Sequence, residues 1–162
     1  MQSQIDWSIH KEAHMNESKS SPCPCCSGKP YKSCCQRYHR GELAENALTL
    51  MRSRYSAYAL HLAPYLIATT HPESPYFVSN RKQWLKQIEA FSTQTSFDKL
   101  EILDYQPGEE EAFVTFIAHL SKDKTDLSFT EKSRFKKQGL AWLYIDGKIA
   151  RGCLSPGQAK KL

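Results

Sequence analysis

The sequence predicts an α+β protein preceded by a short cysteine-rich segment. Five of the six cysteines lie between positions 23 and 35. Apolar residues then recur at the three-and-four spacing of helices as far as about residue 91, and at the alternating spacing of strands from about residue 100. Helices that precede strands, rather than alternate with them, favour an antiparallel sheet packed on helices.

The bulk composition is that of one ordered domain with a small appendage. The chain has 162 residues, of which 40% are hydrophobic and 24% charged, which excludes a disordered or fibrous protein. The net charge of +5 is spread along the chain and is weak evidence for nucleic-acid binding. Because no apolar run is long enough for a membrane span and the amino-terminal sequence lacks the pattern of a signal peptide, we expect a cytoplasmic protein without membrane insertion.

The cysteine spacing predicts a zinc site, because disulfides are disfavoured in the cytoplasm. Cys23 and Cys25 point to the same side of an extended segment. Turn-forming residues at 27–30 can bring this pair against Cys34 and Cys35. Four thiolates around one Zn²⁺ form the tetrahedral arrangement of a structural site.

Cys26 is predicted to lie outside this ligand set, because neighbouring side chains on an extended strand diverge. A disulfide or redox cluster and inert buried thiols stay open as alternatives. Cys153, isolated near the carboxyl end, is expected to be a small hydrophobic residue. Four nearby cations can offset the negative charge of a zinc tetrathiolate: Lys29, Lys32, Arg37 and Arg40.

Three helices are predicted after the cysteine segment. The first is marked by apolar residues at helical spacing: Ala44, Leu48, Met51, Tyr55, Tyr58, Ala59 and Leu62. Pro64 opens a short second helix that ends by Pro72. Asn80 is the predicted N-cap of a third helix, which ends in a polar cluster at 92–96.

About four strands follow, at 100–103, 111–120, 126–137 and 140–145. Asp146 and Gly147 then predict a tight turn into residues 148–151. The sheet is expected to wrap over the helices.

Residues 23–35, CPCCSGKPYKSCC, resemble the SEC-C motif CxCxSGxxxxxC[CH], named for the zinc-binding tail of the secretion ATPase SecA. The resemblance implies the same four zinc ligands. Cys26 stands where glycine is usual, which leaves an alternate ligand or a redox-sensitive thiol open. The element order resembles the NTF2-like fold, in which a curved sheet and helices enclose a cone-shaped pocket.

Several stretches together resemble the YchJ family of bacterial proteins: LMRSRYSAY at 50–58, THP at 70–72, EKSRF at 131–135 and WLYIDG at 142–147. Members pair an amino-terminal SEC-C motif with an NTF2-like middle domain, and many carry a second SEC-C motif. The sequence RGCLSPGQ at 151–158 lacks that cysteine spacing, so one zinc site is expected. The match runs from Cys23 to about Ile149. We expect four parts in the chain: a flexible segment at 1–22, the SEC-C motif at 23–40, the NTF2-like domain at 41–152 and a tail at 153–162.

Strand alternation directs His119 and Glu131 into the expected pocket. A satisfied structural histidine, with Glu131 bonded to Arg52 or Arg54 of the first helix, is the favoured interpretation, while an acid–base pair and a ligand site are the alternatives. An arginine there could also bind a carboxylate or phosphate. Since no nucleophile motif, phosphate loop or paired-carboxylate signature is present, no catalytic residue is assigned.

The sequence therefore favours a non-enzymatic zinc-knuckle protein whose basic surface binds a protein partner, as the similar SecA tail does. An enzyme or small-ligand receptor using the pocket is the first alternative. Nucleic-acid binding is the second, because Tyr31 and Tyr38 lie among the cations of the knuckle.

Overall fold

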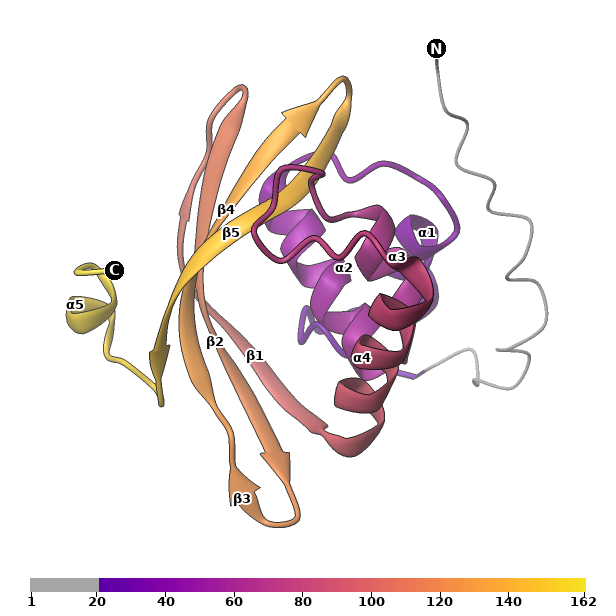
Figure 1. Ribbon diagram of the computed structural model, residues 1–162. Coiled ribbons are helices and arrows are strands. Elements are labelled where there is room, and N and C mark those ends of the chain that lie inside the picture. Colours follow the sequence, from indigo (N-terminus) through magenta and orange to yellow (C-terminus); the bar gives the residue numbers. More distant parts are fainter. Residues whose placement is uncertain (1–20) are drawn as a thin grey trace.

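A curved antiparallel sheet carries the main helices on its concave face (Figure 1). The computed structural model describes residues 21–162, so most of the segment expected to be flexible, 1–22, lies outside the described residues. The long strands run in the order β1-β2-β4-β5, and the short β3 pairs with β2. Their bounds are β1 Ser96–Gln106, β2 Glu111–Lys122, β3 Thr125–Asp126, β4 Phe129–Gln138 and β5 Ala141–Arg151. The predicted antiparallel α+β fold is confirmed.

The three predicted helices form α2 (Ala47–Ala59), α3 (Ala63–Ala68) and α4 (Arg81–Gln94). Asn46 caps α2, since its side chain accepts a 2.8 Å hydrogen bond from the Thr49 amide. Asn80 caps α4 in the same way, as predicted. Within residues 21–162, none of the helices combines the length and the apolar character that a membrane crossing requires.

The tight turn predicted at Asp146 and Gly147 is wrong, because β5 continues through both residues. In the register with β4, Ser133 faces Gly147 and Arg134 faces Asp146. The Arg134 guanidinium donates to both carboxylate oxygens of Asp146, at 2.9 and 2.6 Å. Cross-strand pairing therefore outweighs the local turn preference of an Asp-Gly pair.

Helix α2 is buried on more than one side. Ser53 and Ser56 are fully buried, although small polar residues usually mark the solvent side of a helix. The cysteine segment and α1 (Gln36–His39) cover this side, and His39 Nε2 lies 2.8 Å from the Ser53 carbonyl oxygen. Helix α2 consequently packs against the cysteine segment on one side and against the sheet on the other.

The carboxyl-terminal residues cover the opposite, convex face of the sheet, where Figure 1 shows α5 (Pro156–Ala159). The Thr130 hydroxyl of β4 donates to the Gly152 carbonyl at 2.8 Å and accepts from the Leu154 amide at 2.9 Å. These bonds hold the carboxyl-terminal segment against the sheet. Thr130 and Ile117, which face outward from the sheet, are buried.

Candidate metal centre and internal cavity

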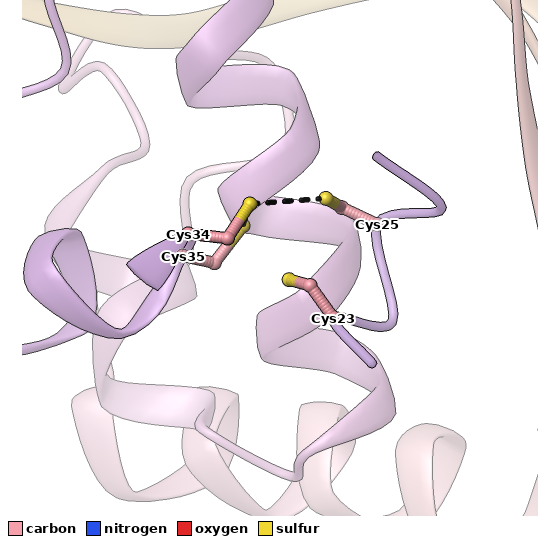
Figure 2. A group of neighbouring side chains, drawn as sticks. All are labelled: Cys23, Cys25, Cys34 and Cys35. Carbon is pink, nitrogen blue, oxygen red and sulfur yellow. Dashed lines mark hydrogen bonds between the residues drawn. The ribbon is translucent and has the colours of Figure 1, made fainter. Parts of the chain in front are cut away.

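The four predicted zinc ligands lie together. The Sγ atoms of Cys23, Cys25, Cys34 and Cys35 are all within 4.8 Å of one another (Figure 2). Cys34 Sγ lies 3.6 Å from Cys25 Sγ and 3.9 Å from Cys35 Sγ. Four sulfurs placed tetrahedrally at about 2.3 Å from a Zn²⁺ would be about 3.8 Å apart. All six cysteines are free, so the cluster has the dimensions of a metal site and contains no disulfide.

A compact loop brings the two cysteine pairs together. The Cys23 amide donates to the Lys29 carbonyl at 2.9 Å, which folds residues 23–29 into a turn. Gly28 supports this turn with a φ of +80°, a conformation that side chains disfavour. The 3₁₀ turn η2 (Tyr31–Ser33) then leads into Cys34 and Cys35.

Cys26 lies outside the cluster. Its side chain is exposed, and its Sγ accepts a 3.4 Å hydrogen bond from the Leu100 amide of β1. Its φ of +58° is in the left-handed region, which glycine adopts at the lowest cost. This backbone conformation explains why glycine would suit the position.

Hydrogen bonds and burial shift the pKa values of three of the four thiols in different directions. Hydrogen bonds from Cys23 and Cys35 lower the pKa of Cys25, whereas hydrogen bonds with Cys23 and Cys25, together with burial, raise the pKa of Cys35. Burial raises the pKa of Cys34 to about 11. The surroundings therefore favour the thiolate form of Cys25 and the neutral form of Cys34 and Cys35, and a cation at the centre of the cluster would favour the thiolate form of all its ligands.

Two hydroxyl groups contact the sulfurs from outside the cluster. Ser27 Oγ lies 3.2 Å from Cys34 Sγ, and Ser56 Oγ of helix α2 lies 3.4 Å from Cys23 Sγ. Both can donate to a thiolate, as the outer ligands of metal sites do. No local pattern points to Ser56 as a neighbour of the cysteines, because it is 33 residues from Cys23.

Arg52 belongs to the knuckle and not to the pocket, contrary to the prediction. Its Nη1 donates to the Cys25 carbonyl at 2.7 Å, and its side chain does not line the cavity. Arg37, expected to offset the charge of the zinc site, is paired instead with Glu42 and Glu45. Periodicity could not separate Arg52 from Arg54, because helix α2 is covered on both sides.

A cavity of about 360 Å³ lies between the helices and the concave face of the sheet. Ligand pockets usually occupy about 300–1,000 Å³. Its wall is mainly apolar and aromatic, with rings from Tyr58, Trp84, Phe91, Phe97, Phe116 and Tyr144. The expected NTF2-like pocket is therefore present and is not filled by the core.

Glu131 lies in the cavity wall, on β4. Its Oε1 accepts hydrogen bonds from Ser133 Oγ at 2.7 Å and from Tyr144 Oη at 3.0 Å. Burial nevertheless raises the pKa of this carboxyl above its ordinary value. A Cβ atom at Gly147 would lie 2.1 Å from Oε1, so glycine makes room for the carboxyl group.

His119 does not reach the cavity, so its assignment to the pocket is corrected. The β2 residues that line the cavity are Phe116, Ala118 and Leu120. His119 faces the convex side, where its Nε2 lies 3.4 Å from Glu101 Oε2. The alternation was ambiguous because residues 114–118 are all buried, the outward-facing ones beneath the carboxyl-terminal residues.

Arg54, rather than Arg52, is the cavity arginine. Its side chain is 7% exposed. Its Nη1 donates to the Leu66 carbonyl at 3.0 Å and to Thr69 Oγ1 at 2.7 Å, and its Cζ lies 4.8 Å from the centre of the Tyr144 ring. Within residues 21–162, no carboxylate oxygen lies within the 4.0 Å of an ion pair with Arg54.

An NTF2-like domain that carries a four-cysteine SEC-C segment at its amino end defines a recognisable class of protein. Residues 46–147 match the family model of the YchJ middle NTF2-like domain. The chain is 40% identical over 136 residues to a UPF0225 protein of Pectobacterium carotovorum, covering 79% of this chain and 83% of that one. It is 36% identical over 131 residues to a UPF0225 protein of Vibrio parahaemolyticus, covering 79% and 75%. This chain belongs to the YchJ family.

Two solved structures are similar over most of the chain. The solution structure of a SEC-C motif containing protein from Rhodopseudomonas palustris has a TM-score of 0.68 at 31% identity, covering 79% of this chain and 98% of that one. The crystal structure of a SEC-C motif containing protein from Psychrobacter arcticus has a TM-score of 0.66 at 26% identity, covering 84% and 86%. Both support the predicted combination of motif and domain.

Proposed function

We propose that this protein is a non-enzymatic binding protein of the cytoplasm, with a knuckle folded around one structural Zn²⁺ and a cavity that takes a small apolar ligand. Cys23, Cys25, Cys34 and Cys35 would hold the ion. Four thiolates leave no open position for a substrate, so the metal has a structural role. Because the knuckle is too short to bury a core, the ion would supply its folding energy.

The observation that carries the binding role is the aromatic cavity of about 360 Å³. Glu131 lies in its wall, while His119 is on the other face of the sheet. The acid–base pair that an enzyme would use is therefore not assembled from these two residues. An apolar pocket with a few polar groups favours a receptor for a small molecule.

Filling the cavity tests this role. Saturation-transfer NMR with toluene and 1-octanol should detect binding to the wild-type protein and not to Ala118→Leu, since Ala118 lines the cavity. Ala90→Leu, the same change on an exposed residue of α4, should bind as the wild type does. Binding that survives in a folded Ala118→Leu variant, or no binding to the wild type, would contradict the proposal.

A second role, docking to a protein partner, is favoured by the exposed cations of the knuckle, Lys29, Lys32 and Arg40. Nucleic-acid binding has less support, because Tyr38 is buried and the Tyr31 hydroxyl lies 2.8 Å from His39 Nδ1. Pull-downs with intact protein and with a variant carrying glutamate at the three cations should differ if this surface docks. Binding that falls steeply with salt and is lost on nuclease treatment would indicate nucleic acid instead.

A further inference from the structure

We propose that the cavity binds a small apolar monocarboxylate, with Arg54 as its cationic partner and Glu131 as a neutral hydrogen-bond donor. This inference rests on the proposed binding role of the cavity and names the chemical class of the ligand. It is carried by the arrangement of charge and hydrogen bonds around the cavity.

Within residues 21–162, Arg54 is a buried cation without an anionic partner. The guanidinium group has five N–H donors, and the hydrogen bonds that Arg54 makes within residues 21–162 all run from Nη1. Its partners there are a carbonyl and two hydroxyl groups, which are neutral. A buried charge is stable only when it is paired, so a cavity bordered by Arg54 favours an anionic ligand. The planar guanidinium matches the geometry of a carboxylate.

Glu131, in the same cavity wall, would repel an anionic ligand if it were ionised. Burial raises its pKa and favours the neutral acid, while the charge of Arg54 acts in the opposite direction. Tyr58, Tyr144 and Asp146 are the other titratable groups that act on it. Oε1 already accepts from Ser133 and Tyr144, so the proton of the neutral acid belongs on Oε2. Oε2 can then donate to a carboxylate.

The size and the wall of the cavity limit the ligand that it can hold. A volume of about 360 Å³, at roughly 30 Å³ per water, corresponds to on the order of a dozen non-hydrogen atoms. Three cavity-lining side chains are also well exposed: Tyr76 at 50%, Phe91 at 43% and Ile149 at 57%. They give the cavity an apolar entrance. A medium-chain fatty acid or a phenylalkanoate fits these limits, whereas a multiply charged phosphate would face one cation in an apolar wall.

The test compares three probes of similar length and different charge: octanoate, 1-octanol and octylamine. Calorimetry and the fluorescence of Trp84, which lines the cavity, report binding. Octanoate should bind about tenfold or more tighter than octanol, as expected for a hydrogen-bonded charge pair, and octylamine most weakly. Glu131→Gln should keep octanoate affinity within about threefold, because the amide donates as the neutral acid does.

Arg54→Met should remove the preference for octanoate over octanol. Arg52→Met, on the same helix but outside the cavity, should keep it. If Arg54→Met does not fold, the probe series on the wild-type protein and on Glu131→Gln decides the question.

The outcomes separate this inference from the proposed function. Equal binding of octanol and octanoate would overturn the carboxylate inference and leave the binding role standing. Preferred binding of octylamine, abolished by Glu131→Gln, would show an ionised Glu131 and overturn it as well. If none of the three probes enters the wild-type cavity, both proposals fail.

Discussion

Cys23 Sγ and Ser56 Oγ lie 3.4 Å apart, so the cysteine cluster is in contact with helix α2. Two neighbours of Ser56 on this helix, Tyr55 and Tyr58, line the cavity. One helix therefore forms a wall of both sites. Metal binding by the knuckle is expected to stabilise the cavity, because both depend on the position of α2.

The purified protein should contain about one equivalent of zinc, and Cys35→Ser should lose it, because three thiolates and a hydroxyl hold Zn²⁺ more weakly. Elemental analysis measures the stoichiometry. Cys26→Ser is the matched control and should retain the metal, since Cys26 lies outside the cluster. Metal retained in Cys35→Ser and lost in Cys26→Ser would reverse the ligand assignment.

Removal of zinc should loosen the knuckle before the sheet. Hydrogen exchange after chelation should increase most at residues 23–40, because the proposed metal coordination would take the place of a hydrophobic core there. Amides of β2 and β4 should stay protected, since both strands lie inside the sheet. Equal loss of protection in both regions would show that the domain cannot fold without the metal.

Ser56→Ala should weaken zinc affinity by about 10–100-fold, because outer hydroxyl partners orient metal ligands. Competition with a chromophoric chelator measures the affinity. Ser33→Ala is the control, since the Ser33 hydroxyl is exposed and donates to the Pro30 carbonyl, away from the sulfurs. Identical affinities of the two variants would mean that Ser56 only fills space between α2 and the cysteine cluster.

Local signals in the sequence were sufficient for the order of the three main helices and four long strands and for the grouping of the four thiols. Asn80 caps its helix through a hydrogen bond to a residue three positions away, so the cap does not depend on how the helix packs. The two cysteine pairs lie within thirteen residues of sequence. Such features depend on neighbours in the chain, so spacing and turn chemistry predict them.

The pocket residues were harder to predict because they depend on what covers each face. Alternation along β2 places His119 on the wrong face, because both faces of this strand are buried and the pattern does not distinguish them. Arg52 and Arg54 could not be separated on a helix packed on two sides, and Gly147 was assigned to a turn although it makes room for Glu131. Contacts between distant segments decide these positions, and periodicity carries no information about them.

Gly147→Ala should destabilise the protein by about 1–3 kcal/mol, because its Cβ atom would displace the buried Glu131 carboxyl from its hydrogen bonds. Chemical denaturation measures the loss. Gly157→Ala should be nearly neutral, since nothing lies within 4 Å of an added Cβ there. In a Glu131→Ala background, Gly147→Ala should cost less. Additive losses would show that the strain arises elsewhere.

The stability gained by Glu131→Gln should depend on pH. Burial raises the pKa of Glu131 above the usual value of about 4.5. Between that value and the raised pKa, the folded protein holds a proton that the unfolded chain releases, so wild-type stability falls as pH rises, by at most about 1.4 kcal/mol per pH unit from this group. Glutamine has no such proton, and the cysteine cluster is the same in both proteins.

Urea unfolding of the two proteins from pH 4.5 to 8 measures this difference, which should grow in favour of Glu131→Gln and then level off. Glu101→Gln is a control whose difference from the wild type should stay nearly constant over this range, because a hydrogen bond from Lys99 lowers the pKa of Glu101 below its usual value of about 4.5. That carboxylate stabilises the fold above its unfolded pKa and loses the effect as pH falls through its folded pKa. Parallel curves for wild type and Glu131→Gln would mean that the cavity leaves Glu131 ionised, and the neutral donor assigned to it would then be wrong.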